Sequence, residues 1–381
     1  MLIGSFSAPG QAAQPLYLNQ PRVAQRIVLT QHKEGTYFHC ALPIHPRLPS
    51  LSSLNQVNEF NLIAKLCAKL PLGDRTILGP GDDCAILKPS RGNQLITIDS
   101  MVEGVHFKLG WGTPEMLGAK ALTVNLSDIA AMGGRPKICV VNLAIRRGLD
   151  GKFFTRLYAG LNAAARAAKV GVVGGNITQA EQLAITIALL GEGGTAIMRR
   201  DTARSGDAIY VTGTVGDAAL GLRILGKKLA ARGAARAYLI NRLLQPTARL
   251  AAGARLTRLR PPPSAIDISD GLHQDLGHIV ERSKLGAEIE AGLIPLSVAY
   301  RATVGDDPRI ALTGGEDYEL LFCMPQRAPD AALTGRLGVR VTRIGRIVKR
   351  RGIRIIDAER WTPPLPRTLA GWDQLHHPER Q

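Results

Sequence analysis

The sequence predicts a mixed fold of the α/β or α+β class with two domains. Its 381 residues are enough for two hydrophobic cores. Short apolar segments bounded by glycine alternate with longer segments of helical period through both halves of the chain. The basic pair Arg199-Arg200 lies between the halves, so we place the domain boundary near residues 195–205.

The first 57 residues differ in composition from the rest of the chain. Proline, serine, glutamine and histidine are frequent there, and no hydrophobic period is maintained. We therefore expect residues 1–57 to form a poorly ordered N-terminal extension. The rest of the chain is expected to divide into residues 58–195 and residues 196–381.

In the first half, apolar residues recur every three or four positions in some segments and without interruption in others. The former predict helices at residues 59–66, 118–132 and 153–169. The latter predict strands at residues 95–99, 138–145, 170–176 and 183–189. We expect the strand at 170–176 to run into a turn at Gly174-Gly175, because paired glycines are typical of turns.

The second half repeats this alternation. Strands are expected at residues 208–212, 319–323 and 339–347. Helices are expected at residues 216–229, across a long helical region at 234–259, and after the stretch described next.

The stretch from Ala265 to Leu272 reads Ala-Ile-Asp-Ile-Ser-Asp-Gly-Leu and places two carboxylates and a hydroxyl within four residues. It places Asp267 and Asp270 between the end of an apolar strand and the start of a helix. One interpretation is a helix cap, because an oxygen of Ser269 or Asp270 can accept a hydrogen bond from a first-turn amide. The other is a metal–phosphate site, because carboxylates suit Mg²⁺ and a helix N-terminus suits phosphate. The stretch alone favours neither.

Further acids lie at element ends or on a helix face. They are Asp82, Asp83, Asp99 and Asp128. In a chain of net charge +17, repulsion would disfavour bringing carboxylates together unless cations bridge them. Each acid alone could be a turn former, but the set as a whole indicates a cation-binding site. His106, Lys120 and Arg200 are candidates for contacts to phosphate.

Composition argues against several classes of protein. Aromatic residues make up only 4% of the chain, so a stacking platform for nucleic acid is not expected. The five cysteines form no C-x-x-C pair, which fits free thiols in a reducing cytoplasm. No apolar run reaches the length of a membrane helix, and the N-terminus lacks the order of a signal peptide. We expect a cytoplasmic protein without nucleic-acid or membrane partners; a basic nucleic-acid-binding protein is the alternative from another class.

Several motifs together resemble those of thiamine-monophosphate kinases. They are Gly81-Asp82-Asp83-Cys84-Ala85, the run from Asp99 to Phe107, the helix Lys120 to Gly133, Val211 to Asp217, Ile266 to Leu272, and Thr313 to Leu320. They occur in that family's order, from about Glu59 to the C-terminus. The resemblance implies a two-domain fold like that of aminoimidazole-ribonucleotide synthetase. Residues 58–195 would bind ATP and Mg²⁺ and form a dimer sheet, and residues 196–381 would form an α/β domain.

The resemblance also implies an activity. The family transfers the γ-phosphoryl group of ATP to thiamine monophosphate, giving thiamine diphosphate, the last step of thiamine diphosphate biosynthesis. The transfer is expected to be direct and in line, with several Mg²⁺ ions that neutralise two anionic substrates. The partners implied are thiamine monophosphate and a second copy of the chain in a homodimer.

The resemblance assigns site roles by position. The implied metal ligands are Asp83, Thr97, Asp99, Asp128, Asp267 and Asp270. The implied ATP contacts are Gly175, Asn176, Arg200 and Ser269. His106, Glu316 and Trp372 are implied to line the thiamine monophosphate pocket, and Asp267, Asp270 and Arg200 are implied to be catalytic.

Two positions depart from the family pattern. Asn176 stands where the family has aspartate, so it keeps an oxygen ligand but loses a charge and should bind Mg²⁺ more weakly. Ile98 stands where the family has a hydroxyl residue beside Asp99. The alternative enzyme is a selenophosphate synthetase or hydrogenase-maturation protein of the same superfamily, but those use a catalytic or C-terminal cysteine, which this chain lacks near its end.

Overall fold

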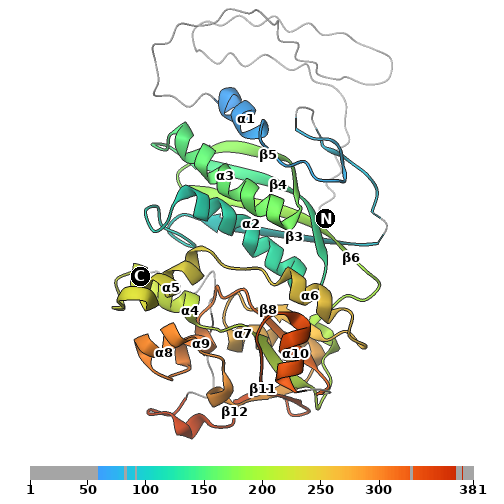
Figure 1. Cartoon of the computed structure of the whole chain (residues 1–381), viewed down its shortest axis with the longest axis vertical. Helices are drawn as coiled ribbons and strands as arrows, with labels where there is room; N and C mark the ends of the chain where they lie inside the picture. The colour runs from blue at the N-terminus through green and yellow to red at the C-terminus, as the bar shows by residue number, and fades with distance from the viewer. Residues whose placement is uncertain (1–58, 81–83, 91, 327–328, 366–370, 372–381) are drawn as a thin grey trace, which may run out of the picture. The chain divides into compact units, whose positions relative to one another are not determined.

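The computed structural model describes residues 59–80, 84–90, 92–326, 329–365 and 371. These residues belong to one compact unit, residues 55–381. Within the described residues, a four-stranded sheet and a six-stranded sheet each pack against helices, and a small two-stranded sheet is added (Figure 1). The expected extension at residues 1–57 lies outside the described residues, as do Asp83 and Trp372.

The first half builds the four-stranded sheet and its helices. Its elements are α1 (Glu59–Cys67), β1 (Thr76–Leu78), β2 (Ile86–Leu87), β3 (Asn93–Val102), α2 (Pro114–Ala131), β4 (Arg135–Arg146), α3 (Gly151–Ala168), β5 (Gly171–Ala180) and β6 (Ala184–Gly193). The strand order is β3-β6-β4-β5; β4 and β5 are parallel, and the other pairs are antiparallel. The helices and strands expected in this half are present, and several of them extend beyond the expected ends.

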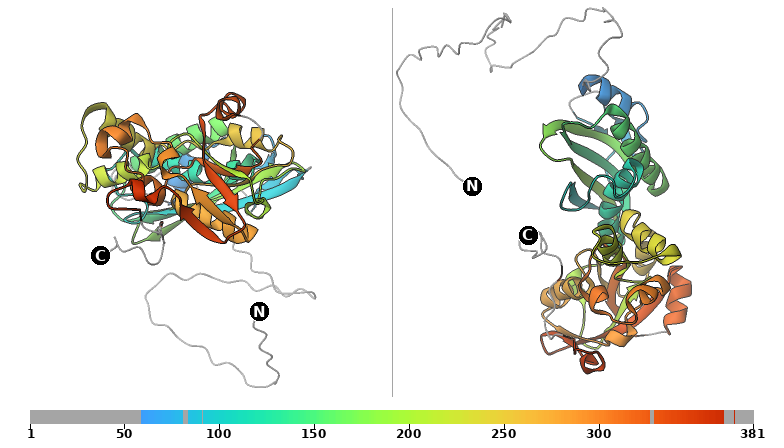
Figure 2. Two further views of the ribbon diagram at one scale, coloured as in Figure 1. Left: turned by 90° about the horizontal axis from the view of Figure 1, so that it is seen from below. Right: turned by 90° about the vertical axis from the view of Figure 1, so that its left-hand side faces the viewer.

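Helices α2 and α3 cover one face of this sheet (Figure 2, right). The Thr113 side chain caps α2 by accepting a hydrogen bond from the amide of Met116 at 3.3 Å. The two helices approach closely because a Cβ at Gly118 would overlap the Leu157 carbonyl oxygen, and one at Gly160 would overlap backbone of α2. Small residues thus fix the position of α2, which carries several of the candidate site residues.

The alternation along β3 sorts its side chains between two faces. Leu95 and Met101 are buried under the helices, and Thr97 and Asp99 share their face because side chains repeat with period two. Ile96 and Ile98 point to the opposite face, where they are 75% and 65% exposed. The structure therefore separates an inner face that carries Asp99 from an outer face that carries apolar side chains.

The expected turn at Gly174-Gly175 is wrong. Strand β5 continues through both glycines to Ala180, and residues 174–176 pair in parallel register with residues 140–142 of β4. A Cβ at Gly175 would overlap the Val141 carbonyl oxygen, so this glycine permits a close approach of two strands. A pair of glycines in a sequence can indicate either a turn or a close approach of two strands. Only the position of the neighbouring strand distinguishes these two structures.

The second half builds the six-stranded sheet and its helices. Its elements are η1 (Arg200–Thr202), β7 (Ala208–Thr212), α4 (Asp217–Leu225), α5 (Gly233–Leu244), α6 (Leu250–Leu256), β8 (Ser264–Asp267), α7 (Leu272–Ser283), β9 (Gly286–Ile289), η2 (Ala291–Leu293), α8 (Val298–Val304), α9 (Arg309–Thr313), β10 (Leu320–Met324), α10 (Asp330–Leu337), β11 (Val341–Val348), β12 (Gly352–Ile355) and η3 (Ala358–Arg360). The strand order is β12-β9-β11-β7-β10-β8, and only β12 and β9 are parallel.

Both faces of the six-stranded sheet are buried, which explains why its central strands read as continuous apolar runs. Ile209 and Val211 of β7 join a core with α4 and α7. Tyr210 between them points to the other face and stacks on Phe322 of β10 at a centroid distance of 5.2 Å. None of the described helices is long and apolar enough to cross a membrane.

The helical region expected at residues 234–259 is confirmed, and the structure divides it into two helices. These are α5 and α6, with residues 245–249 between them. Pro246 lies in this gap, and proline lacks the amide that a helix interior needs. The break allows α6 to pack against α2, where a Cβ at Gly253 would overlap the Ala130 carbonyl oxygen.

The two halves share a hydrophobic core. Ala130 and Ala131 at the end of α2 are buried in the same cluster as Tyr210 and Phe322 of the six-stranded sheet. This packing brings the C-terminal part of α2 beside β8 and fixes where the candidate site residues of the two halves meet. The boundary between residues 195 and 196 stays a prediction.

Candidate active site

Asp267 is the last residue of β8 and contacts α2 from the first half of the chain. It is buried, and its carboxylate accepts a hydrogen bond from the Ser127 hydroxyl at 2.7 Å. Asp128 follows Ser127 on α2, and its carboxylate accepts a hydrogen bond from the Thr97 hydroxyl of β3. Three elements distant in sequence thus bring polar side chains together.

A cavity of about 620 Å³ lies over these side chains. Four carboxylates line it, those of Asp99, Asp128, Asp267 and Asp270. Other lining residues include His106, Ser269, Glu316, Tyr318 and Gly371. The structure therefore brings most of the predicted metal ligands and two of the predicted substrate residues to one cavity.

The electrostatics of this cluster reflect crowded negative charge. Burial, then the charges of Asp128 and Asp270, raise the pKa of Asp99 to about 6. Burial and the charge of Asp128 raise the pKa of Asp267 to about 7, against the hydrogen bond from Ser127. Burial also raises the pKa of Asp128, opposed by the Thr97 hydroxyl and by the positive charge of Arg200. A bound cation would relieve this repulsion.

The capping interpretation of this stretch does not hold, because the N-cap residue is neither Ser269 nor Asp270. Helix α7 has Gly271 at its N-cap position, with no side-chain cap. The loop is instead held by Asp275 of the helix, whose carboxylate accepts hydrogen bonds from the amides of Ser269, Asp270 and Gly271 at 3.0–3.1 Å. Gly271 has a φ of 124°, a backbone conformation that favours glycine. Asp270 is thus not the N-cap residue of α7, and the metal–phosphate interpretation of this stretch stays a prediction.

Glu316 lies in the turn between α9 and β10 and lines the cavity. Its carboxylate is bound by the buried Lys120 ammonium of α2 at 2.9 Å. Its φ is 68°, and that of Tyr318 is 53°, so this turn holds two side chains in the left-handed region. His106 follows β3, and its Nδ1 accepts a hydrogen bond from the amide of Val102 at 3.1 Å.

A buried charged network supports this turn from behind. The Glu319 carboxylate accepts hydrogen bonds from Arg249, from Arg242 at 3.1 Å and from the Thr212 hydroxyl at 2.7 Å. Asp317 accepts a hydrogen bond from the amide of Gly216 at 2.6 Å. Burial raises the pKa of Asp317 to about 8. Because these partners fix alternate residues of the turn, Glu316 and Tyr318 are held facing the cavity.

Arg200 begins the short helix η1, at the junction of the two halves. Its backbone carbonyl accepts hydrogen bonds from the hydroxyls of Ser264 at 3.1 Å and Ser283 at 3.0 Å. Its positive charge opposes the rise that burial causes in the pKa of Asp128, but Arg200 is exposed and is not among the residues that line the cavity. A contact between Arg200 and a bound phosphate stays a prediction.

The structure does not bring Gly175 and Asn176 to this cavity. Both lie on β5, and the Asn176 side chain donates a hydrogen bond to Asn142 of β4 at 3.0 Å. Asn142 is paired in turn with Thr186, and Thr186 with Ser100, so these side chains form a polar row across the sheet. Ile98 precedes this row on the outer face of β3.

Three residues around the site were missed from the sequence. Ser127 and Tyr318 stand beside predicted site residues, but nothing in their spacing indicated that Ser127 would bind Asp267 or that Tyr318 would line the cavity. Asp275 could have been found from helical period, because it follows the N-cap Gly271 by four residues, about one helical turn. Asp270, Asp275 and His278 each offer one oxygen or nitrogen atom, and these three atoms lie within 4.8 Å of one another.

With this geometry established, comparison with known proteins decides the family. Models of the AIR synthase related proteins match twice, the N-terminal domain at residues 81–193 and the C-terminal domain at residues 204–358. The thiamine-monophosphate kinase of Escherichia coli (strain K12) is 41% identical over 299 residues, which cover 76% of this chain and 90% of that protein. The chain belongs to the thiamine-monophosphate kinase family.

Solved structures of thiamine-monophosphate kinases share the fold. The crystal structure of the enzyme from Stenotrophomonas maltophilia K279a has a TM-score of 0.71 and 37% identity, and covers 78% of this chain and 96% of its own. AaThiL complexed with AMPPCP and TMP has a TM-score of 0.65 and 33% identity, over 85% of this chain and 98% of its own. The two-domain fold and the family expected from the motifs are therefore confirmed.

Proposed function

We propose that the protein transfers the γ-phosphoryl group of ATP directly and in line to thiamine monophosphate, giving thiamine diphosphate and ADP. The observation that carries this proposal is the meeting of Asp99, Asp128, Asp267 and Asp270 in one cavity of a chain with net charge +17. Family membership supports the substrates, and a relative of the same fold binds AMPPCP and TMP.

The residues of the cavity fit Mg²⁺. Carboxylate and hydroxyl oxygens are the ligands that this cation prefers. Burial and neighbouring carboxylates raise the pKa values of Asp99 and Asp267, and a bound cation would offset this cost of ionisation. We propose Thr97, Asp99, Asp128, Asp267 and Asp270 as the described ligands, together with Asp83 from the resemblance. Several Mg²⁺ ions bound there would neutralise phosphate charge and align the donor with the acceptor.

The protein's own side chains would then orient the two substrates. Arg200 would contact the transferred phosphate from the junction of the halves, and Ser269 would contact ATP from the loop after β8. His106 and Glu316 would line the acceptor side, with Trp372 assigned there by resemblance. The Glu316 carboxylate lines the cavity, where it is paired with the Lys120 ammonium at 2.9 Å. Gly175 and Asn176 remain proposed ATP contacts.

We also propose a homodimer formed through the four-stranded sheet. No helix among the described residues covers the outer face of this sheet (Figure 2). Ile96, Ile98 and Val140 are 75%, 65% and 40% exposed there. Exposed apolar side chains that gather on one face of a sheet are typical of an interface between proteins. A cytoplasmic location is proposed because the described cysteines, Cys67, Cys84, Cys139 and Cys323, are all free thiols.

The activity can be tested directly. Purified protein is incubated with ATP, MgCl₂ and thiamine monophosphate, and thiamine diphosphate and ADP are separated by ion-pair chromatography. We expect both products in equal amounts, and none after chelation of Mg²⁺ with EDTA. A folded protein that forms ADP without thiamine diphosphate, or neither product, contradicts the proposal.

A further inference from the structure

Tyr318 lines the acid-lined cavity, and the roles proposed above do not use it. Its side chain is buried in the cavity wall, and it lies two residues before β10. Its backbone amide donates a hydrogen bond of 2.8 Å to the carbonyl of Ile268. The turn that carries Tyr318 is therefore joined to the loop after β8 that carries Asp270.

The backbone of Tyr318 has a φ of 53°, which is rare for a bulky side chain. Its two neighbours in the chain fix this conformation. The Asp317 carboxylate accepts a hydrogen bond from the Gly216 amide at 2.6 Å, and the Glu319 carboxylate accepts one from Arg249 at 2.6 Å. Strained residues that the surrounding structure holds in place are concentrated at functional sites. The strain indicates that the side chain of Tyr318 has a role in the cavity.

The hydroxyl end of Tyr318 faces the carboxylates of the cavity. Burial is the largest cause that raises the pKa of this phenol, and four nearby carboxylates add to it. They are those of Glu316, Asp99, Asp267 and Asp270. These charges act on the phenol oxygen, because the negative charge would form there. The hydroxyl thus keeps its proton at neutral pH and is available as a hydrogen-bond donor.

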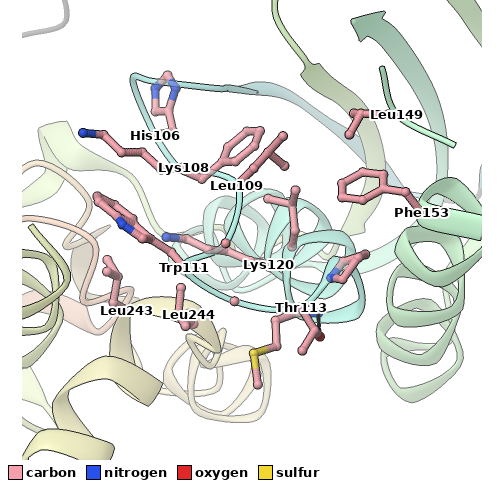
Figure 3. A pocket seen from close by; sticks show the side chains of 16 residues that line it. His106, Lys108, Leu109, Trp111, Thr113, Lys120, Leu149, Phe153, Leu243 and Leu244 are labelled. Atoms are coloured by element: carbon pink, nitrogen blue, oxygen red, sulfur yellow. Dashed lines mark hydrogen bonds between the residues drawn. The ribbon is translucent and has the colours of Figure 1, made fainter. Parts of the chain in front are cut away.

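Within the described part of the chain, no residue forms a hydrogen bond with the Tyr318 hydroxyl. Two of the surrounding carboxylates already have other partners. Lys120, which lies in the wall of the neighbouring apolar pocket, binds the Glu316 carboxylate at 2.9 Å (Figure 3). Asp267 accepts its hydrogen bond from Ser127. The hydroxyl is therefore open to a group that enters the cavity.

We propose that the Tyr318 hydroxyl donates a hydrogen bond to the phosphoryl group during its transfer. This inference rests on the proposed function and adds a catalytic residue to it. The carboxylates of the cavity, once ionised, can only accept hydrogen bonds, so they offer no donor to a phosphoryl oxygen. A fixed neutral donor stabilises charge on that oxygen and does not compete with the cations that the carboxylates are proposed to hold. The phenol keeps its proton throughout.

The test compares two variants that each remove one hydroxyl. Tyr318→Phe keeps the ring that forms part of the cavity wall, so the fold should be preserved. Tyr210→Phe is the matched control, because the Tyr210 hydroxyl is also buried without a hydrogen-bond partner in the structure. Tyr210 lies in a core cluster with Phe322 and is not among the residues that line the cavity. Melting temperatures show whether both variants remain folded.

We expect Tyr318→Phe to lower kcat about tenfold to a hundredfold, the usual effect of losing one hydrogen bond to a charged group. The KM values for ATP and thiamine monophosphate should stay within about twofold of the parent values. Tyr210→Phe should leave all three constants within about twofold. An unchanged kcat in Tyr318→Phe, or a raised KM alone, would overturn the proposal. A loss of kcat that additional Mg²⁺ restores would also overturn it, because the hydroxyl would then act through the carboxylates.

Calorimetry separates this inference from the proposed function. Each protein is titrated with ADP and MgCl₂, with and without aluminium fluoride, which mimics a phosphoryl group in transfer and needs no thiamine monophosphate. Tyr318→Phe should bind ADP with aluminium fluoride at least about tenfold more weakly than the parent and ADP alone within about twofold. Equal effects on both ligands, or a parent protein that gains no affinity from aluminium fluoride, contradict the role of Tyr318, whether or not thiamine diphosphate is formed.

Discussion

The backbone amide of Asp270 donates a hydrogen bond of 3.1 Å to the carboxylate of Asp275. The amides on either side, of Ser269 and Gly271, donate to the same oxygen. A side chain one turn into α7 therefore holds the loop that presents Asp270 to the cavity. The position of Asp270 depends on a residue that does not line the cavity itself.

The first prediction concerns Asp275. Asp275→Ala leaves the loop amides without their acceptor, at a cost to the free energy of unfolding of about 1–3 kcal/mol for each amide that finds no other partner. Turnover should fall roughly tenfold or more, because Asp270 loses its fixed orientation. Asp275→Asn keeps an oxygen acceptor, so its stability and turnover should lie between those of the parent protein and those of Asp275→Ala. Chemical denaturation and steady-state kinetics measure both effects, and full turnover in folded Asp275→Ala would contradict this role.

The second prediction separates the metal site from a helix cap. Asp270→Asn should lower turnover by roughly a hundredfold or more, the size of effect seen when one group that stabilises a transition state is removed. The melting temperature should stay the same or rise, because one of the mutually repelling charges is gone. If the main effect is a lower melting temperature, Asp270 is instead a structural residue of the loop.

The third prediction concerns pH. Burial raises the pKa of Asp317 from 3.8 to about 8 in the folded protein. Between these values the folded state holds a proton that the unfolded state has released, so the stability due to this group falls as pH rises from about 4 to 8 and is constant above. The Asp317→Asn variant should show a smaller decrease in stability over this range. Urea unfolding of both proteins from pH 5 to pH 9 measures the difference, and parallel curves would exclude a raised pKa.

The fourth prediction concerns the outer face of the four-stranded sheet. Ile98→Asp places a charge in the proposed interface and should convert the dimer to a monomer, with little change in secondary structure. Val298→Asp introduces the same charge at an exposed site on α8 and should leave the dimer intact. Light scattering after size-exclusion chromatography gives the mass of each protein. A parent protein that is monomeric at micromolar concentration contradicts the proposed interface.

Hydrophobic period and local composition predicted most individual elements. The strands around Asp99 and Asp267 and the helix bearing Asp128 are confirmed, because apolar runs and amphipathic faces are properties of adjacent residues. The acids at element ends also indicated a cation site before any contact was known. Where one pattern fits two structures, the prediction can be wrong: Gly174-Gly175 was expected to form a turn and instead continues a strand.

The sequence by itself determined the types of elements, the set of acids and, through its motifs, the family. Only the tertiary structure decided which of these residues meet. Asp99, Ser127 and Asp267 are far apart in the chain and approach because α2 packs against both sheets. Asn176 was assigned to the same site, yet it lies on another face because the glycines before it continue a strand. Such contacts depend on how buried surfaces fit together, which no local pattern records.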